Sequence, residues 1–131
     1  MKHRGGVVSG IGAVSFAVLL ACGPPQVTLT PLGAGVVYPA TPDSVAIPLY
    51  ATTKPECPYD EIAAITAEGH IAHSVESEVL AALRAKARAV GGHAIVGYTQ
   101  SSRVATSGSL STDIHVRSGT AIRFRSADCM K

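Results

Sequence analysis

Tryptophan is absent from this chain of 131 residues, only two phenylalanines are present, and charged residues make up 15% of it. One of the phenylalanines, Phe16, lies in an N-terminal apolar run, so a folded core has to be built from valine, isoleucine, leucine and alanine. The sequence also lacks a Gly-x-Ser-x-Gly elbow, a phosphate-binding glycine-rich loop and a His-Glu-x-x-His motif. We therefore expect a protein that is not an enzyme.

A long hydrophobic segment is missing as well. The apolar run of residues 7–20 has about 14 residues, whereas a helix that spans a bilayer needs about 20. A basic segment precedes the run, and Leu19-Leu20-Ala21-Cys22 ends it, which is typical of a bacterial lipoprotein signal. We predict that residues 1–21 form a signal peptide and that Cys22 is lipidated. The alternative is an ordinary secretory signal with a cysteine near its cleavage site by chance.

Removal of the signal peptide changes the charge balance. The full chain has a formal net charge of +2, and loss of Lys2 and Arg4 leaves nine basic against nine acidic residues. A formally neutral mature chain gives no basis for binding nucleic acid, and we predict no such partner. Gly23 after the lipidated cysteine resembles the sorting signal of outer-membrane lipoproteins. We expect a protein of the bacterial cell envelope, lipid-anchored in the outer membrane and facing the periplasm.

Prolines are confined to one part of the chain, since all eight lie between Pro24 and Pro58. Residues 22–44 are uncharged up to Asp43, and we predict that they form a lipidated cysteine followed by an extended tether with a reach of at most about 70 Å. Short apolar pieces at 27–29 and 36–38 offer strand pairing as an alternative. The folded domain is expected to span residues 45–131.

The domain begins with strand patterns and continues with a helix. Val45, Ile47 and Leu49 alternate with other residues as in a half-buried strand, which Pro48 restricts to a sheet edge. A second strand is predicted at residues 61–66. Residues 74–90 have helical periodicity, with Ser74 as N-cap and Gly91 at the end. The helix is expected to pack on the sheet through Val79, Leu83 and Val90.

Three further strands are predicted at residues 94–99, 110–116 and 120–124, with a turn at 117–119 that keeps both apolar rows of the last pair on one side. The fold class is therefore α+β, in the order β-β-α-β-β-β. We expect a small, mainly antiparallel sheet with one helix packed on one face.

This strand phase places a group of basic side chains on the sheet face away from the helix. Asp113 is the one acid expected beside them. Such a face is either solvated or a contact surface for a partner subunit or an anionic component of the envelope. The residues are His115, Arg117, Arg123 and Arg125.

Two cysteines remain after lipidation of Cys22. Cys57 lies just before the second strand and Cys129 just after the last one. In an oxidising compartment an even pair predicts a disulfide, and closing a loop of about 73 residues is worth about 4 kcal/mol in the chain-entropy model. Free or redox-active thiols and metal ligation are the alternatives.

Two segments carry a resemblance to a known family. ARAVGGHAIVGY, residues 87–98, and SGTAIRFR, residues 118–125, resemble the most recognisable parts of the YbjQ-like heavy-metal-binding family. The resemblance implies a YbjQ-like α/β domain, with Gly91 as a left-handed helix C-cap and Gly97 at a close backbone approach. It also implies ring-like homo-oligomers. The chain has a more distant likeness to the stress-sensing outer-membrane lipoprotein RcsF.

Metal binding has some support from the spacing of histidines. His70 and His73 are three residues apart and His93 follows the helix, and imidazoles of this kind bind zinc or copper. We expect no resident cofactor, and a zinc or copper site at these histidines is the alternative.

The sequence thus predicts an envelope lipoprotein with a non-catalytic interaction, assembly or sensing role. A periplasmic metal-binding module and a structural homo-oligomer are the alternative functions.

Overall fold

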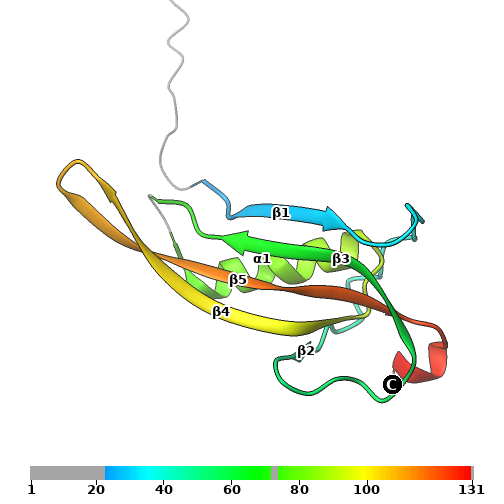
Figure 1. The fold of residues 1–131 in the computed structure, drawn as a ribbon. Coiled ribbons are helices and arrows are strands. Elements are labelled where there is room, and N and C mark those ends of the chain that lie inside the picture. Colours follow the sequence, from blue (N-terminus) through cyan, green and yellow to red (C-terminus); the bar gives the residue numbers. More distant parts are fainter. Residues whose placement is uncertain (1–22, 72–73, 131) are drawn as a thin grey trace, which may run out of the picture.

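The computed structural model describes residues 23–71 and 74–130 (Figure 1). A five-stranded sheet in the order β1-β3-β5-β4-β2 carries the single α-helix of the described segments on one face. β2 pairs parallel with β4 and every other neighbour is antiparallel, so the sheet is mixed. The α+β class is therefore confirmed. The elements are β1 (Gln26–Pro31), β2 (Leu49–Tyr50), β3 (Tyr59–Glu68), α1 (Glu76–Ala89), β4 (Ala94–Ser107), β5 (Leu110–Phe124) and the 3₁₀ turn η1 (Ala127–Met130).

The segment expected as a tether belongs in large part to the fold. β1 pairs antiparallel with β3 over its whole length, from Gln26 opposite Glu68 to Pro31 opposite Ala63. Further on, Thr41 is buried, and its hydroxyl donates to the carbonyl of Gly92 at 2.7 Å. β1 forms part of the sheet because its apolar residues alternate: Val27 and Leu29 pack on the core, while Thr28 and Thr30 are exposed. The domain therefore includes β1, and the expected boundary at residue 45 is too late.

The edge strand predicted around Pro48 is present but short. β2 comprises Leu49 and Tyr50, paired with Ile95 and Val96 of β4. Ile47 is buried before it, as the alternation predicted.

Helix α1 packs as its periodicity predicted. Val79 and Leu83 are fully buried and Val90 is partly buried against the same cluster. The N-cap is Val75 rather than Ser74, and no side chain of the described segments caps it. The helix ends at Ala89 with Val90 as C-cap, and the φ of 86° at Gly91 after it confirms the predicted left-handed residue.

The last two strands form one long hairpin, and the predicted turn at 117–119 is wrong. β5 continues from Leu110 to Phe124, and the turn lies at Gly108 and Ser109. Within β5, Gly119 faces Ile95 so closely that a Cβ would lie 2.3 Å from its Cγ2. Gly119 therefore lies within a strand, where it leaves room for the side chain of Ile95. The observed order is β-β-β-α-β-β.

Each face of the sheet has its own apolar cluster. Small residues of the strands let α1 approach its face, where the buried members are Ile47, Ala63, Ile65, Ala67, Val79, Leu83, Ala87, Ile95 and Ala121. The opposite face buries Ala94, Val96, Ile122 and Phe124 under Tyr50, Tyr59 and the two cysteines. The apolar row of β5 at 122 and 124 thus faces away from the helix.

Candidate functional site

The predicted basic contact surface is wrong in its orientation. Arg117 lies in the same β5 row as Ala121, which packs against α1, so its side chain is on the helix side. Its side chain is only 5% exposed and pairs with Glu76 in the first turn of α1. One guanidinium nitrogen also donates to the carbonyls of Ser101 and Val116, while Nε has no hydrogen-bond partner among the described residues. Arg117 is therefore a structural residue and no open contact surface.

The other members of the predicted surface are also separated. Arg123 donates to the carbonyl of Gly91 at 2.9 Å, just beyond the end of α1, and its guanidinium lies 4.9 Å from the ring centre of Tyr38. A cation is favoured there because the helix C-terminus carries partial negative charge. Arg125 lies beyond the end of β5, is exposed and pairs with Asp60, which raises its pKa.

His115 is the fourth member, and its backbone has a structural role. Its carbonyl accepts from the amide of Gly69 at 3.0 Å, and its amide donates to the hydroxyl of Ser74 at 2.9 Å. The first bond extends the ladder between β3 and β5, and the second links β5 to the segment just before α1. The hydroxyl of Ser74, expected to cap the helix, accepts this bond from β5 instead.

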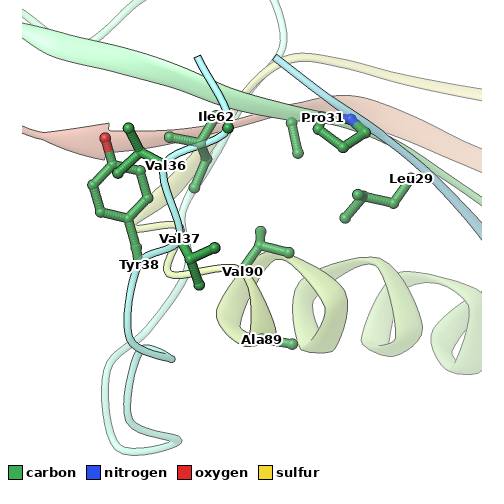
Figure 2. Close-up of a pocket in the computed structure, with 10 residues that line it drawn as sticks. Leu29, Pro31, Val36, Val37, Tyr38, Ile62, Ala89 and Val90 are labelled. Carbon is green, nitrogen blue, oxygen red and sulfur yellow. The ribbon is translucent and has the colours of Figure 1, made fainter. Parts of the chain in front are cut away.

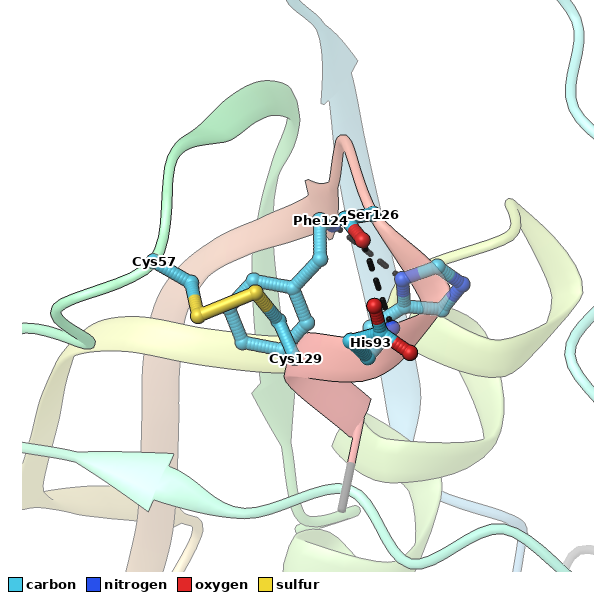
Figure 3. The surroundings of a disulfide bond; sticks show 6 residues. Cys57, His93, Phe124, Ser126 and Cys129 are labelled. Carbon is cyan, nitrogen blue, oxygen red and sulfur yellow. Dashed lines mark hydrogen bonds between the residues drawn. A yellow bond between two sulfur atoms is a disulfide. The ribbon is translucent and has the colours of Figure 1, made fainter.

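His93 is held in the disulfide region rather than in a metal site (Figure 3). Its Nδ1 accepts from the amide of Phe124 at 3.1 Å, and its ring stacks on that of Phe124 with centroids 6.0 Å apart. Burial and, to a smaller extent, the charge of Arg123 lower the pKa of His93. A neutral imidazole with its proton on Nε2 fits this arrangement.

The three candidate metal ligands do not come together where they can be placed. His70 follows β3, at the end of the sheet from which α1 starts, whereas His93 lies at the other end of α1. His73 lies outside the described residues. Within residues 23–71 and 74–130, no three His, Cys, Asp or Glu side chains are grouped as a metal site.

The predicted disulfide between Cys57 and Cys129 is confirmed (Figure 3). It links the segment before β3 to η1 after β5, with a Cα–Cα distance of 6.0 Å. Both cysteines pack on the cluster that contains Phe124. The bond thus covers the sheet face away from the helix at one end and joins the two ends of a long loop.

An apolar cavity of about 300 Å³ lies where the C-terminal end of α1 meets the loop after β1 (Figure 2). Leu29, Val90, Val36 and Val37 are among its lining residues, and the two valines of the loop, Val36 and Val37, are 63% and 91% exposed. Among the described residues, no acidic, basic or histidine side chain lines it. It has the size for an apolar side chain and carries no pair of groups for acid–base chemistry.

The β4–β5 hairpin provides a second, larger exposed feature, here called the ribbon and defined as residues 99–115. Pairing of β5 with β3 ends at Val116, and β2 covers β4 at Ile95 and Val96 alone. A register shift between Val96 and Thr99, with Gly97 at a φ of 61°, separates the covered part of β4 from the rest. The ribbon is thus two-stranded and projects from one end of the sheet (Figure 1).

The outer edge of β4 in the ribbon has no strand partner within the part of the chain that the structure describes. Nearly all of its residues from 99 to 107 are exposed, including Val104 at 66%. They contain no proline and one charge, Arg103, which is paired with Glu68 at 3.0 Å. The opposite sheet edge, β1, ends in Pro31 and follows Pro24 and Pro25. Proline and charge commonly protect strand edges, so β4 is the less protected edge of the sheet.

Sequence reasoning missed the ribbon. The Gly108-Ser109 pair between strand-like residues is a hairpin signal, but the serine and threonine content of the flanks favoured a loop. Gly97 is also not at a close backbone approach, because a Cβ at this position would meet no atom within 4 Å beyond its chain neighbours; its positive φ explains the glycine instead.

Comparison with protein-family models, curated proteins and solved structures found no match. The resemblance of residues 87–98 and 118–125 to the YbjQ-like family therefore stays a prediction. In the described segments, no helix has the length and apolar character needed to cross a membrane. The predicted signal peptide and Cys22 lie outside these segments.

Proposed function

We propose that this protein is a lipid-anchored component of the bacterial cell envelope that binds another macromolecule through the ribbon and performs no catalysis. The unpaired edge of β4 carries this proposal. On the side away from β5, its backbone amides and carbonyls between Thr99 and Ser107 lack a neighbouring strand among the described residues. Such an edge binds an extended segment through main-chain hydrogen bonds.

The composition of the ribbon supports binding rather than catalysis. Val104 and Leu110 are large apolar side chains exposed at 66% and 72% near the turn. Around them the residues are mostly serine and threonine, which neither repel an incoming strand nor offer an acid–base pair. The metal-binding alternative has less support, because His70 and His93 are at different ends of α1.

The anchor is tested on the full-length protein in bacterial cells. Replacing Cys22 with serine removes the lipid acceptor, so we expect an uncleaved or soluble precursor in place of a membrane-bound form. Separation of membrane and soluble fractions measures this. Unchanged partition of Cys22→Ser into the membrane contradicts the anchor.

The binding role is tested on the same protein, briefly cross-linked in intact membranes and then extracted in mild detergent. We expect the wild type to elute above the mass of one chain with its detergent, and Val104→Lys to elute as a monomer. Asp113→Lys is the matched control, since Asp113 lies directly opposite Val104 in the ribbon but on β5. A wild type that elutes as a monomer overturns the proposal.

A further inference from the structure

We infer that the partner of the ribbon is a second copy of this chain, paired antiparallel edge to edge through β4 with the twofold axis at Val104. The inference rests on the proposed function and names its partner. Two sheets would then join into one through the two β4 strands.

The backbone pattern identifies which groups of β4 are free. In β5, the amide and carbonyl of His115 point away from β4, toward Ser74 and Gly69. Its neighbours Ile114 and Val116 therefore point toward β4, where they pair with Arg103 and Ser101. Alternation along β4 then directs the amides and carbonyls of Gln100, Ser102, Val104 and Thr106 to the open edge.

The side chains favour one register for the pairing of two β4 strands. With the axis at Val104, this residue lies opposite its own copy, and Ser102 lies opposite Thr106 of the second chain. Two exposed valines then bury each other, as favourable cross-strand pairs do. An axis at Arg103 would place two guanidinium groups directly opposite each other, and like charges in that position are destabilising.

Charge also favours a second copy over a charged partner. In the chosen register Arg103 faces Ala105 of the other chain and keeps its own partner Glu68. The remaining residues of this edge are neutral, so the edge is complementary to itself. About six main-chain hydrogen bonds form across the axis.

The expected contact is small. A standard stable interface buries about 800 Å² on each partner, and one pair of short strands buries less. Association is therefore expected to be reversible and dependent on protein density.

A cysteine at the axis tests the inference in membranes that contain the full-length chain. Val104→Cys places two thiols on Cα atoms about 5.5 Å apart, which a disulfide spans. Cys57 and Cys129 are already bonded to each other. Mild oxidation is expected to yield a homodimer on non-reducing gels, identified by mass spectrometry of the linked peptide. Asp113→Cys, also at an exposed position but separated from its copy by both β4 strands, is expected to stay monomeric.

Paired proline variants keep the result independent of misfolding. Val104→Pro removes an amide that faces the open edge and is not bonded within the described part of the chain. The variant is therefore expected to unfold at the same midpoint as the wild type but to form no higher-mass species. Ala105→Pro removes an amide bonded to Thr112 across the ribbon and is expected to lower the midpoint.

Failure of this inference is distinguishable from failure of the proposed function. A wild type of high native mass whose Val104→Cys form links to a different protein overturns the second copy and leaves the binding role. A high-mass form that persists in Val104→Pro overturns the β4 edge as the contact. A monomeric wild type overturns both.

Discussion

The buried guanidinium of Arg117, in the middle of β5, pairs with the carboxylate of Glu76 in the first turn of α1. The pair ties the N-terminal end of the helix to the sheet. It lies at the base of the ribbon, where Arg117 also donates to the carbonyl of Ser101 in β4.

Arg117→Ala is expected to lower the free energy of unfolding by about 2–3 kcal/mol, because it removes the packed stem of a buried side chain together with its ion pair. Urea unfolding measures this. Arg125→Ala is the matched control, since Arg125 forms an exposed pair with Asp60 and its loss is expected to leave the midpoint nearly unchanged. Equal effects of the two variants would contradict a structural role for Arg117.

Removing the disulfide with Cys57→Ser and Cys129→Ser together is expected to cost about 4 kcal/mol, because the bond closes a loop with a sequence separation of 72. Unfolding with and without reductant gives the comparison. Reductant should shift the wild type to the midpoint of the double variant and leave that variant unchanged. A wild type that is insensitive to reductant would show that the bond does not stabilise the fold.

Stability is expected to fall below neutral pH through His93. Burial and Arg123 lower its pKa from the ordinary 6.5, so the unfolded chain binds a proton more readily than the native one. The contribution of His93 is therefore present above about pH 6.5 and is lost as the pH falls from there through the lowered native pKa. His93→Asn keeps an acceptor for the amide of Phe124 without titrating, and its unfolding midpoint should depend less on pH in this window. An equally steep dependence would assign it to other groups.

Gly119→Ala is expected to destabilise the fold by about 1–3 kcal/mol, because its Cβ would lie 2.3 Å from Cγ2 of Ile95. A double-mutant cycle with Ile95→Ala tests the cause. In the Ile95→Ala background the same glycine substitution should cost less. An unchanged cost would mean that some other contact limits the space.

Sequence periodicity predicted the elements that depend on local patterns. Helix α1 and the inward Ile47 follow from residue spacing, and the cysteine pair followed from the expectation of an oxidising compartment; all three are confirmed. The threonine-separated valine and leucine of β1 had the same kind of pattern, but the prolines around it favoured a tether.

The orientation of β5 was not predictable in the same way. Alternation shows that Ile122 and Phe124 share a face, but it does not say whether a helix or another segment covers that face. Here the disulfide-linked segments cover them, while α1 packs on the other row, where Ala121 is buried in the same cluster as Val79 and Leu83. Arg117 and Arg123 therefore lie on the helix side.

The early start of β1 limits how far the domain could move from the lipid that we propose at Cys22. Residues 23–25 alone separate this cysteine from β1, so Cys22 and Gln26 can be at most about 13 Å apart at about 3.3 Å per residue. Gln26 is linked through Glu68 to Val116, where the ribbon leaves the sheet. The ribbon end would thus be held close to the lipid headgroups, and two copies would meet by lateral diffusion within a thin layer. Their surface density, rather than the volume concentration of the compartment, would then govern pairing.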